Sequence, residues 1–218
     1  MGPIYRNHEL LADALAAIYR YYQTAKFAFI RIQPPRIAPN KAPLFLQELA
    51  QHIPAHRITH LTAFHSLVID LHSEIDDIFR GFSKGHKSAV KKSATAGLTA
   101  QPARTMKDID AFCEIFVRMH ARRNLPVGAT HMQTVFRNLF ALFCEQECGS
   151  FIIVNGPSGK MLGGIVIIKQ GTIVRYFKGA ADPEQRKHAI LHSAILASIR
   201  LAKSWNADWF DLWGYAPD

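Results

Sequence analysis

The chain has 218 residues, of which 49% are hydrophobic and 20% are charged, and its formal net charge is +9. This composition is that of a folded protein and excludes a disordered chain. No apolar run approaches the ~20 residues that span a bilayer, and the N-terminus has no secretion signal, so we expect a cytoplasmic protein. The basic balance favours an anionic partner, such as a phosphorylated substrate, nucleic acid or a membrane face; a charge that serves only solubility is the alternative.

The cysteines and histidines do not indicate metal binding. Cys113, Cys144 and Cys148 are an odd set without Cys-x-x-Cys spacing, and the 11 histidines have no ligand spacing. We therefore expect neither a disulfide framework nor a metal site.

The N-terminal third of the chain alternates helix and strand patterns. Apolar residues at helical spacing predict helices over residues 8–25 and 44–50. Strands are predicted at Phe27–Ile32, which is followed by two prolines, and at Ser66–Leu71. Together these elements form an α/β half-unit without its opening strands.

An acid-free basic segment follows. Seven cations and no acidic residue lie between Asp77 and Asp108. Lys84, Lys87 and Lys91 would share one face of a helix, so they and Lys92 are candidates for binding phosphate groups. A solvated helix face is the alternative. We take this segment as a junction between two units.

The remainder of the chain has a clearer pattern. It predicts strands at Leu98–Pro102, Phe151–Asn155, Met161–Lys169, Thr172–Lys178 and Trp209–Trp213, and helices at Ile109–Arg123, Met132–Cys148 and Arg186–Trp205. The turns Gly156–Gly159 and Gln170-Gly171 are typical of β-hairpins. The fold class is therefore α/β (α+β), with a mixed, mainly antiparallel sheet flanked by helices. This order of elements matches the GNAT fold.

The turn before the last helix bears on the choice of acyl donor. In GNAT enzymes this turn reads Gln/Arg-x-x-Gly-x-Gly/Ala, and its backbone N–H groups hold the pyrophosphate of acyl-CoA. Here Gln185 and Arg186 are present, but His188 and Ile190 occupy the glycine positions. Side chains there would crowd the phosphates, which disfavours acyl-CoA as the donor.

Four stretches resemble the FemAB family of peptidoglycan aminoacyltransferases. They are Val68–Leu71 with Lys87–Leu98, Met119–Pro126, Arg175–Asp182 and Trp209–Tyr215. The family has an Asp-Leu strand end followed by a basic segment, an Arg-x-Gly-Phe/Ile helix end, a Tyr-x-Tyr-x-Gly-Ser/Ala-Ser strand and a Tyr-Asp-Leu/Phe-Gly-Gly-Ile strand. The resemblance covers residues 66–215, in the same order and with similar spacing.

The resemblance also implies a domain organisation. Residues 1–75 would be the C-terminal half of a first GNAT-like unit, and residues 76–97 would be the basic helical junction. Residues 98–218 would be a second unit without its final Phe-Lys segment. On this basis we expect a chain that is truncated at both ends relative to the family.

The function that the resemblance implies is aminoacyl transfer. The donor would be aminoacyl-tRNA as a co-substrate, with no bound cofactor, and the acceptor would be the stem-peptide amine of UDP-MurNAc-pentapeptide or lipid II. No residue set has the spacing of a covalent nucleophile and its base, so catalysis would depend on positioning and charge stabilisation. The alternatives are an acyl-CoA-dependent N-acyltransferase of polysaccharide or lipid biosynthesis, and a non-catalytic fragment that binds an anionic partner.

The same resemblance implies roles for individual residues. Arg123, or Arg122 in a register shifted by one, would bind the nucleotide-sugar phosphates, with a helix-end charge as the alternative. Further substrate contacts would come from Arg175, Tyr176, Phe177, Lys178 and Trp213, and contacts to tRNA or another anion from Lys84, Lys87, Lys91, Lys92 and Arg186. Asp211 is a candidate proton acceptor or a buried structural carboxylate. Because side chains alternate along a strand, Tyr176 and Phe177 are expected to face opposite sides.

Overall fold

The computed structural model describes residues 17, 20, 66–125, 127–185 and 188–213. Contacts within the chain divide it into two units, Met1–Thr62 and Ala63–Asp218. In the first unit only Ala17 and Arg20 are described, and both are helical and exposed. The strand predicted at residues 27–32 and the helix predicted at 44–50 lie outside the described residues.

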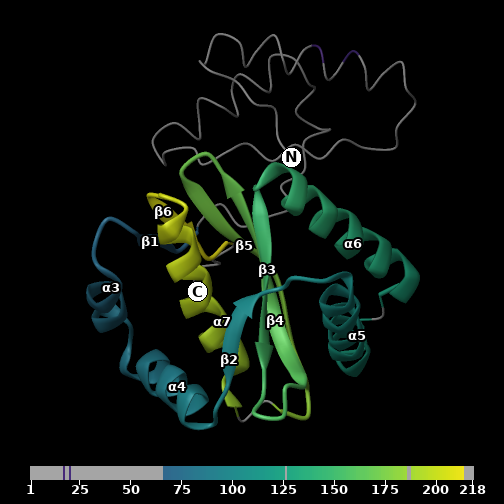
Figure 1. Ribbon diagram of the computed structural model, residues 1–218, viewed down its shortest axis with the longest axis horizontal. Coiled ribbons are helices and arrows are strands. Elements are labelled where there is room, and N and C mark those ends of the chain that lie inside the picture. The colour runs from purple at the N-terminus through teal and green to yellow at the C-terminus, as the bar shows by residue number, and fades with distance from the viewer. Residues whose placement is uncertain (1–16, 18–19, 21–65, 126, 186–187, 214–218) are drawn as a thin grey trace, which may run out of the picture. The chain divides into compact units, whose positions relative to one another are not determined.

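Six strands and five helices make up the described part of the second unit (Figure 1). In chain order they are β1 (Val68–Asp70), α3 (Ile75–Gly81), α4 (Lys84–Thr95), β2 (Thr99–Pro102), α5 (Met106–Arg122), α6 (Ala129–Gln146), β3 (Gly149–Asn155), β4 (Met161–Gln170), β5 (Ile173–Ala181), α7 (Ile190–Ser204) and β6 (Trp209–Asp211). Each element predicted from Ser66 onward is present, with shifted ends.

Two shifts of helix ends have a local cause. α5 begins at Met106, earlier than predicted, because Thr105 accepts a bond from the Asp108 N–H and Asp108 caps the Thr105 N–H in return. α7 begins only at Ile190, because Ala189 has a left-handed conformation with φ of 54° that a right-handed helix does not contain.

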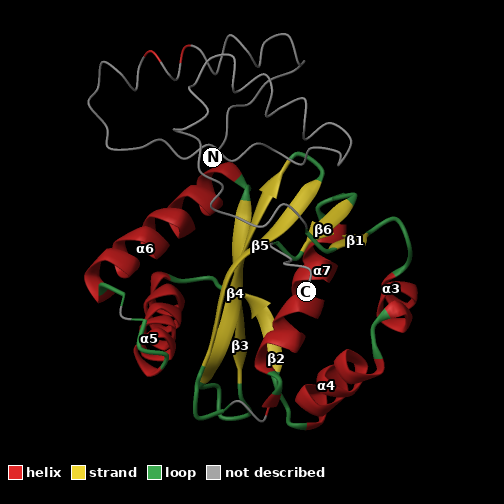
Figure 2. Ribbon diagram, turned by 180° about the vertical axis from the view of Figure 1, so that it is seen from behind, coloured by secondary structure: helices red, strands yellow, loops and turns green. Residues whose placement is uncertain are grey.

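The strands form one sheet in the order β1-β6-β5-β4-β3-β2. β5 and β6 are parallel, and every other neighbouring pair is antiparallel. Helices lie on both sides of the sheet (Figure 2). This confirms the predicted mixed, mainly antiparallel sheet flanked by helices.

Each side of the sheet has its own hydrophobic core. On the α7 face, named after the helix that covers it, Ile165, Ile199 and Phe210 are fully buried. On the α5 face, covered by α5 and α6, the rings of Phe112, Phe136 and Phe151 meet edge to face with centroids 5.3–5.8 Å apart. Such aromatic pairs add to the stability gained from burial alone.

The boundary between the units differs from the expected junction at residues 76–97. β1 pairs with β6 within the sheet of the second unit, and α4 packs against α7. The basic segment is therefore part of the second unit, and the boundary between Thr62 and Ala63 lies before it. Sequence patterns did not reveal this because β1 finds its partner strand at the far end of the chain.

Candidate functional site

The sheet divides part of the way along β5. β6 pairs with β5 only at Ile173–Arg175. Beyond that point the chain after β6 turns toward β1: the Leu212 N–H donates to the Leu67 carbonyl at 2.9 Å, and Trp213 has a φ of 57°. Among the described residues, Tyr176–Ala181 therefore has a strand partner only on its β4 side. We call this stretch the open half of β5. Its unpaired backbone groups can bond to an extended ligand.

A β-bulge lies where the open half begins. Ile167 of β4 faces Tyr176 and Val166 faces Lys178, so Phe177 is the extra residue. Tyr176 packs with the core of the α7 face, whereas Phe177 packs with that of the α5 face and Lys178 reaches the Phe116 ring in the same core. The expected alternation holds for Tyr176 and Phe177. It fails for Phe177 and Lys178, because the extra residue of the bulge leaves both side chains on the α5 face.

An ion pair closes the paired half of β5. Arg175 Nε lies 3.2 Å from Asp211 Oδ2, and the two side chains are only 12% and 10% exposed. Asp211 Oδ1 also accepts the Trp213 backbone N–H at 2.8 Å and the Ser66 hydroxyl. Both carboxylate oxygens are therefore engaged in holding β6, β5 and the chain around them. This arrangement favours the structural reading of Asp211 over that of a proton acceptor.

Aromatic rings and cations continue from this ion pair along the α5 face. The Arg175 guanidinium lies 5.7 Å from the centre of the Trp213 ring, and Trp213 meets Phe177 at 6.3 Å. Lys178 Nζ lies 5.3 Å from the Phe177 ring centre and 5.9 Å from that of Phe116. Cations are attracted to ring faces at such distances. Four predicted substrate-binding residues, Arg175, Phe177, Lys178 and Trp213, are thus contiguous.

Tyr176 lies on the other face, close to a second predicted residue. Its hydroxyl occupies the space that a side chain at position 179 would need, so Gly179 permits this placement. Burial raises the pKa of the Tyr176 phenol, and the positive charge of Arg123 acts in the opposite direction. Arg123 itself is the exposed C-terminal cap of α5. Arg123 thus acts on Tyr176 through its charge.

The turn after β5 uses its own N–H groups. Four of them donate within the protein: Asp182 to Leu162 O, Glu184 to Asp182 Oδ1, Gln185 to Asp182 O and His188 to Gln185 O, at 2.7–3.1 Å. Pro183 has no N–H to offer. These four groups therefore already have acceptors within the protein, and a pyrophosphate would have to compete with those acceptors for them.

Two arginines of α5 hold the same turn. Arg118 reaches the buried carboxylate of Asp182 at 3.4 Å, and Arg122 donates to the Pro183 carbonyl at 3.2 Å. Asp182 therefore points into the protein rather than toward a ligand. Arg122 is exposed and retains further N–H donors. Arg186 lies outside the described residues.

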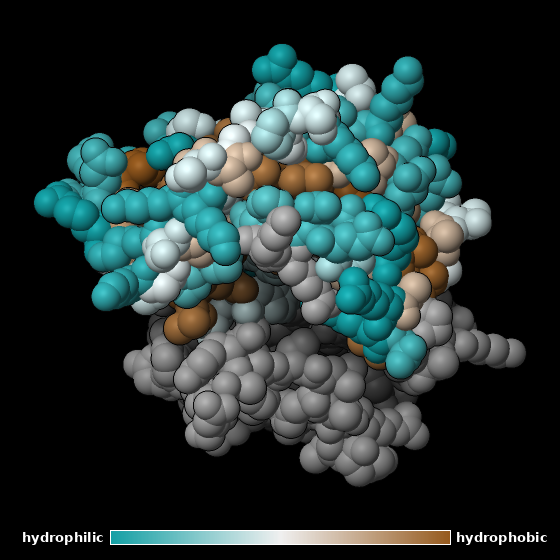
Figure 3. Space-filling model, turned by 90° about the horizontal axis from the view of Figure 1, so that it is seen from below, coloured by the Kyte–Doolittle hydropathy of each residue, from teal (hydrophilic) through white to brown (hydrophobic). Residues whose placement is uncertain are grey.

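The candidate lysines of α4 lie elsewhere. α4 packs against α7, on the side of the sheet away from α5. Lys84, Lys91 and Lys92 are exposed, and Lys87 Nζ donates to the Arg80 carbonyl at 2.9 Å. Within residues 66–125, 127–185 and 188–213, none of the four has a carboxylate at ion-pair distance. In Figure 3, viewed from the side where α4 lies in Figure 1, hydrophilic residues cover most of the described surface.

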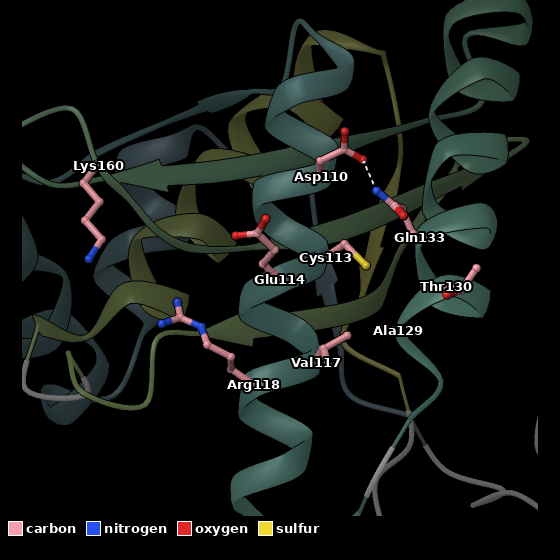
Figure 4. A pocket seen from close by; sticks show the side chains of 9 residues that line it. All are labelled: Asp110, Cys113, Glu114, Val117, Arg118, Ala129, Thr130, Gln133 and Lys160. Carbon is pink, nitrogen blue, oxygen red and sulfur yellow. Dashed lines mark hydrogen bonds between the residues drawn. The ribbon is translucent and has the colours of Figure 1, made fainter.

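A groove of about 630 Å³ is lined by α5, the first turns of α6 and the β3–β4 turn (Figure 4). Asp110, Glu114 and Arg118 line it from α5, Gln133 lines it from α6, and Lys160 lies at the β3–β4 turn. Asp110 binds Gln133 and, at 2.7 and 2.8 Å, the Arg137 guanidinium, which holds the Asp110 pKa below its usual value. None of the residues predicted for the site lines this groove.

Sequence patterns gave no role to His120 or Phe116. The two rings stack at 4.1 Å on α5, and Phe116 also contacts Lys178. The sequence does place His120 four positions after Phe116, a spacing that puts both side chains on one face of a helix. A functional role for this pair could not be predicted, because it depends on the contact with Lys178 of β5, which lies far away in the sequence.

The described residues contain neither a metal site nor a membrane-spanning helix. No group of three or more histidine, cysteine, aspartate and glutamate side chains there could hold a metal ion. No helix in the same residues is long and apolar enough to cross a membrane.

A mixed sheet that divides beside a parallel strand pair, with a turn and then a helix after the open strand, is the arrangement of the GNAT fold. The chain belongs to the family described as acetyltransferase (GNAT) domain, whose model matches residues 80–217. This confirms the predicted class of enzyme. No curated protein sequence matches the chain.

Solved structures support the same fold. FemX is similar over 97% of this chain and 70% of its own, with a TM-score of 0.73 and 15% identity. The C-terminal domain of a predicted lysylphosphatidylglycerol synthetase from Agrobacterium fabrum is similar over 97% of this chain and 62% of its own, with a TM-score of 0.58 and 12% identity. A tandem GNAT protein from the clavulanic acid biosynthesis pathway is similar over 95% of this chain and 62% of its own, with a TM-score of 0.52 and 13% identity. The chain thus spans less than two thirds of the last two, and the likeness to FemX confirms the predicted FemAB-like fold.

Proposed function

We propose that this protein transfers an amino acid from aminoacyl-tRNA to an amine of the stem peptide of a peptidoglycan precursor. The precursor is UDP-MurNAc-pentapeptide or lipid II, and the reaction takes place in the cytoplasm. The FemX-like fold supports this class of reaction. The observation that supports the proposal is the combination of an open half of β5 with a following turn that lacks the glycines of an acyl-CoA loop and has four of its N–H groups bonded within the protein.

The donor follows from the turn after β5. In an acyl-CoA enzyme the free N–H groups of this turn bind the pyrophosphate. Here four of these groups donate to acceptors within the protein, and the buried Asp182 residue accepts two of the bonds. A pyrophosphate would have to displace bonds that already exist and approach a carboxylate. Aminoacyl-tRNA carries no pyrophosphate that this turn would have to bind.

The acceptor follows from the open half of β5 and the end of α5. Arg122 and Arg123 are exposed, and neither has a carboxylate at ion-pair distance within the described segments. Guanidinium groups match the geometry of phosphate oxygens. We assign the diphosphate of the precursor to these two arginines, with the peptide directed toward Tyr176 and Phe177.

The lysines of α4 complete the proposal as a binding surface for the tRNA backbone. Residues 84–107 contain no Phe, Tyr or Trp, so they offer charge to phosphates rather than stacking to bases. Replacing Lys84, Lys87, Lys91 and Lys92 by Gln should weaken tRNA binding and flatten its salt dependence. In a plot of log K against log salt, the slope should change by about 0.7–0.9 for each phosphate that the variant no longer neutralises.

Binding of labelled tRNA over a range of salt concentrations measures this effect. Arg200→Gln, on the exposed side of α7, is the control that should leave the slope unchanged. An unchanged slope in the quadruple variant would mean that α4 is only a solvated face.

The experiment that tests the proposed function is a transfer assay. The full chain is incubated with UDP-MurNAc-pentapeptide and a pool of tRNA charged with labelled amino acids, and the labelled precursor is separated by chromatography. Lipid II replaces the nucleotide precursor in a parallel arm, and labelled acetyl-CoA replaces the tRNA in another. We expect label to pass from tRNA to a precursor, and Arg123→Ala to reduce this transfer while Arg200→Ala does not.

Other outcomes identify the alternatives. Label that passes only from acetyl-CoA would make the protein an acyl-CoA-dependent N-acyltransferase. No transfer together with salt-dependent tRNA binding would make it a non-catalytic RNA-binding chain.

A further inference from the structure

His120 has a fixed tautomer. Its Nδ1 lies 2.9 Å from the Phe116 carbonyl oxygen. A carbonyl oxygen can only accept, so Nδ1 carries the proton of the neutral ring and the lone pair remains on Nε2. The ring is stacked on Phe116 at 4.1 Å with an interplanar angle of 33°, and it is half-buried. The protein thus presents a held imidazole whose basic nitrogen is not used by any hydrogen bond in the described part of the chain.

Lys178 and His120 both contact the ring of Phe116. Lys178 Nζ lies 5.9 Å from the centre of the Phe116 ring and 5.3 Å from that of Phe177, which belongs to the bulge of β5. No carboxylate in the described segments is at ion-pair distance from it. A half-buried ammonium group that ring faces attract and no anion neutralises can stabilise a negative charge that appears nearby.

Both groups lie beside the open half of β5. Phe116, His120 and Arg123 are three or four residues apart, so they follow one another along one face of α5. Phe116 contacts Lys178, and Arg123 is close enough to affect the pKa of Tyr176. Phe116 thus connects His120 of α5 with Lys178 of the open half of β5.

We propose that His120 and Lys178 are catalytic residues of the acyl transfer: His120 Nε2 takes up the proton of the attacking amine, and the Lys178 ammonium stabilises the oxyanion. This inference rests on the proposed function. The amine nitrogen attacks the ester carbonyl carbon of the aminoacyl group, so that a C–N bond forms and the carbonyl oxygen becomes negative. The proton that leaves the nitrogen goes to Nε2 of His120. The C–O bond to the ribose then breaks, and His120 returns the proton to the departing ribose oxygen.

The test compares variants that change chemistry with controls that do not. His120→Gln removes the basic nitrogen but keeps an amide that can donate to the Phe116 carbonyl. The matched control is His131→Gln, at an exposed position in the first turn of α6. We expect His120→Gln to lower kcat by about 100-fold or more with little change in KM, and the control to retain kcat. Added imidazole should restore part of the activity of His120→Ala, because it supplies the missing base.

Lys178 is tested by a pair of substitutions. Lys178→Met removes the charge while keeping the length and the packing on the rings, and Lys178→Arg keeps the charge. Loss of a group that stabilises an oxyanion lowers kcat by about 100- to 1000-fold, so we expect that effect for Met and a smaller one for Arg. Circular dichroism and melting curves, which should match those of the wild type, separate this effect from a failure to fold.

The outcomes separate the two levels of the proposal. Wild-type transfer that survives in His120→Gln and Lys178→Met within about twofold would overturn the catalytic roles and leave the proposed function standing. A fall in kcat without rescue by imidazole, accompanied by a lower melting temperature, would make His120 a structural residue. Absence of transfer in the wild type would overturn the proposed function and, with it, these assignments.

Discussion

The two halves of β5 have opposite surroundings. Ile173–Arg175 is hydrogen-bonded to strands on both sides, and the nearly buried pair of Arg175 with Asp211 joins it to β6. Tyr176–Ala181 is bonded to β4 alone in the described residues, and its Lys178 side chain meets aromatic rings instead of carboxylates. One strand can therefore supply both the support of the sheet and the edge that is open to a ligand. Two charged residues three positions apart thus have unlike surroundings: Arg175 is paired with Asp211, whereas no described carboxylate lies at ion-pair distance from Lys178.

Breaking the supporting half should give the largest effect on stability. Asp211→Leu leaves Arg175 nearly buried without its partner, and we expect a loss of about 3–5 kcal/mol in the free energy of unfolding, measured by urea denaturation. The double variant Arg175→Met/Asp211→Leu should recover most of that loss, because apolar pairs often replace buried ion pairs without penalty.

The control for this prediction is Asp208→Asn. Asp208 faces His72 at 3.4 Å, and its side chain is 41% exposed. A change below about 1 kcal/mol is expected for such a surface pair. Equal effects of the Asp208 and Asp211 variants would contradict the scaffold role of the buried pair.

A smaller effect is expected in the open half, at Gly179. A methyl group there would meet the Tyr176 hydroxyl and the Ile165 side chain, so Gly179→Ala should move the Tyr176 ring and lower stability by about 1–3 kcal/mol. The matched control is Gly81→Ala, where nothing lies within 4 Å of the added carbon. At that helical position alanine should be neutral or stabilising by up to about 1 kcal/mol. Equal destabilisation by both variants would argue against the close approach of Tyr176.

The smallest effect concerns the titration of Tyr176. Burial raises the pKa of its phenol above the ordinary value of about 10, and the Arg123 charge partly offsets this. Because the unfolded chain gives up the phenol proton first, this contribution to stability is complete below about pH 10 and is lost as pH rises through the higher folded pKa. Arg123→Ala should raise the pKa further.

Phenolate absorbance measures this shift. The difference between the wild type and Tyr176→Phe isolates one of the six tyrosines, and the same difference in an Arg123→Ala background gives the effect of the charge. A pKa that does not move on loss of Arg123 would mean that the guanidinium is remote from the open half.

The sequence predicted the elements that are determined locally. The hairpins after β3 and β4 follow from glycine turns, and the long helices follow from apolar spacing around Phe112 and Phe116. The early start of α5 was also readable, since Thr105 and Asp108 have the spacing of a capping box. These features need only a few neighbouring residues.

Features that depend on strand register could not be predicted. The bulge at Phe177 exists only relative to β4, and the pair of Arg175 with Asp211 requires β6 to run parallel to β5. The role of β1 likewise depends on β6, at the end of the described chain. The approach of Lys178 to Phe116 follows from how α5 packs on the sheet. The spacing of residues along the sequence does not determine these contacts, because they depend on strand register and on packing between distant elements.

The central claim is that the open half of β5 and Arg123 bind a phosphorylated precursor while the following turn rejects acyl-CoA. Its most direct test is a thermal-shift titration of the wild type, Arg123→Ala and the control Arg200→Ala with UDP-MurNAc-pentapeptide and, separately, acetyl-CoA. We predict that the precursor raises the melting temperature of the wild type and of Arg200→Ala but not of Arg123→Ala, and that acetyl-CoA leaves all three unchanged. Stabilisation by acetyl-CoA, with no response to the precursor, would contradict the account.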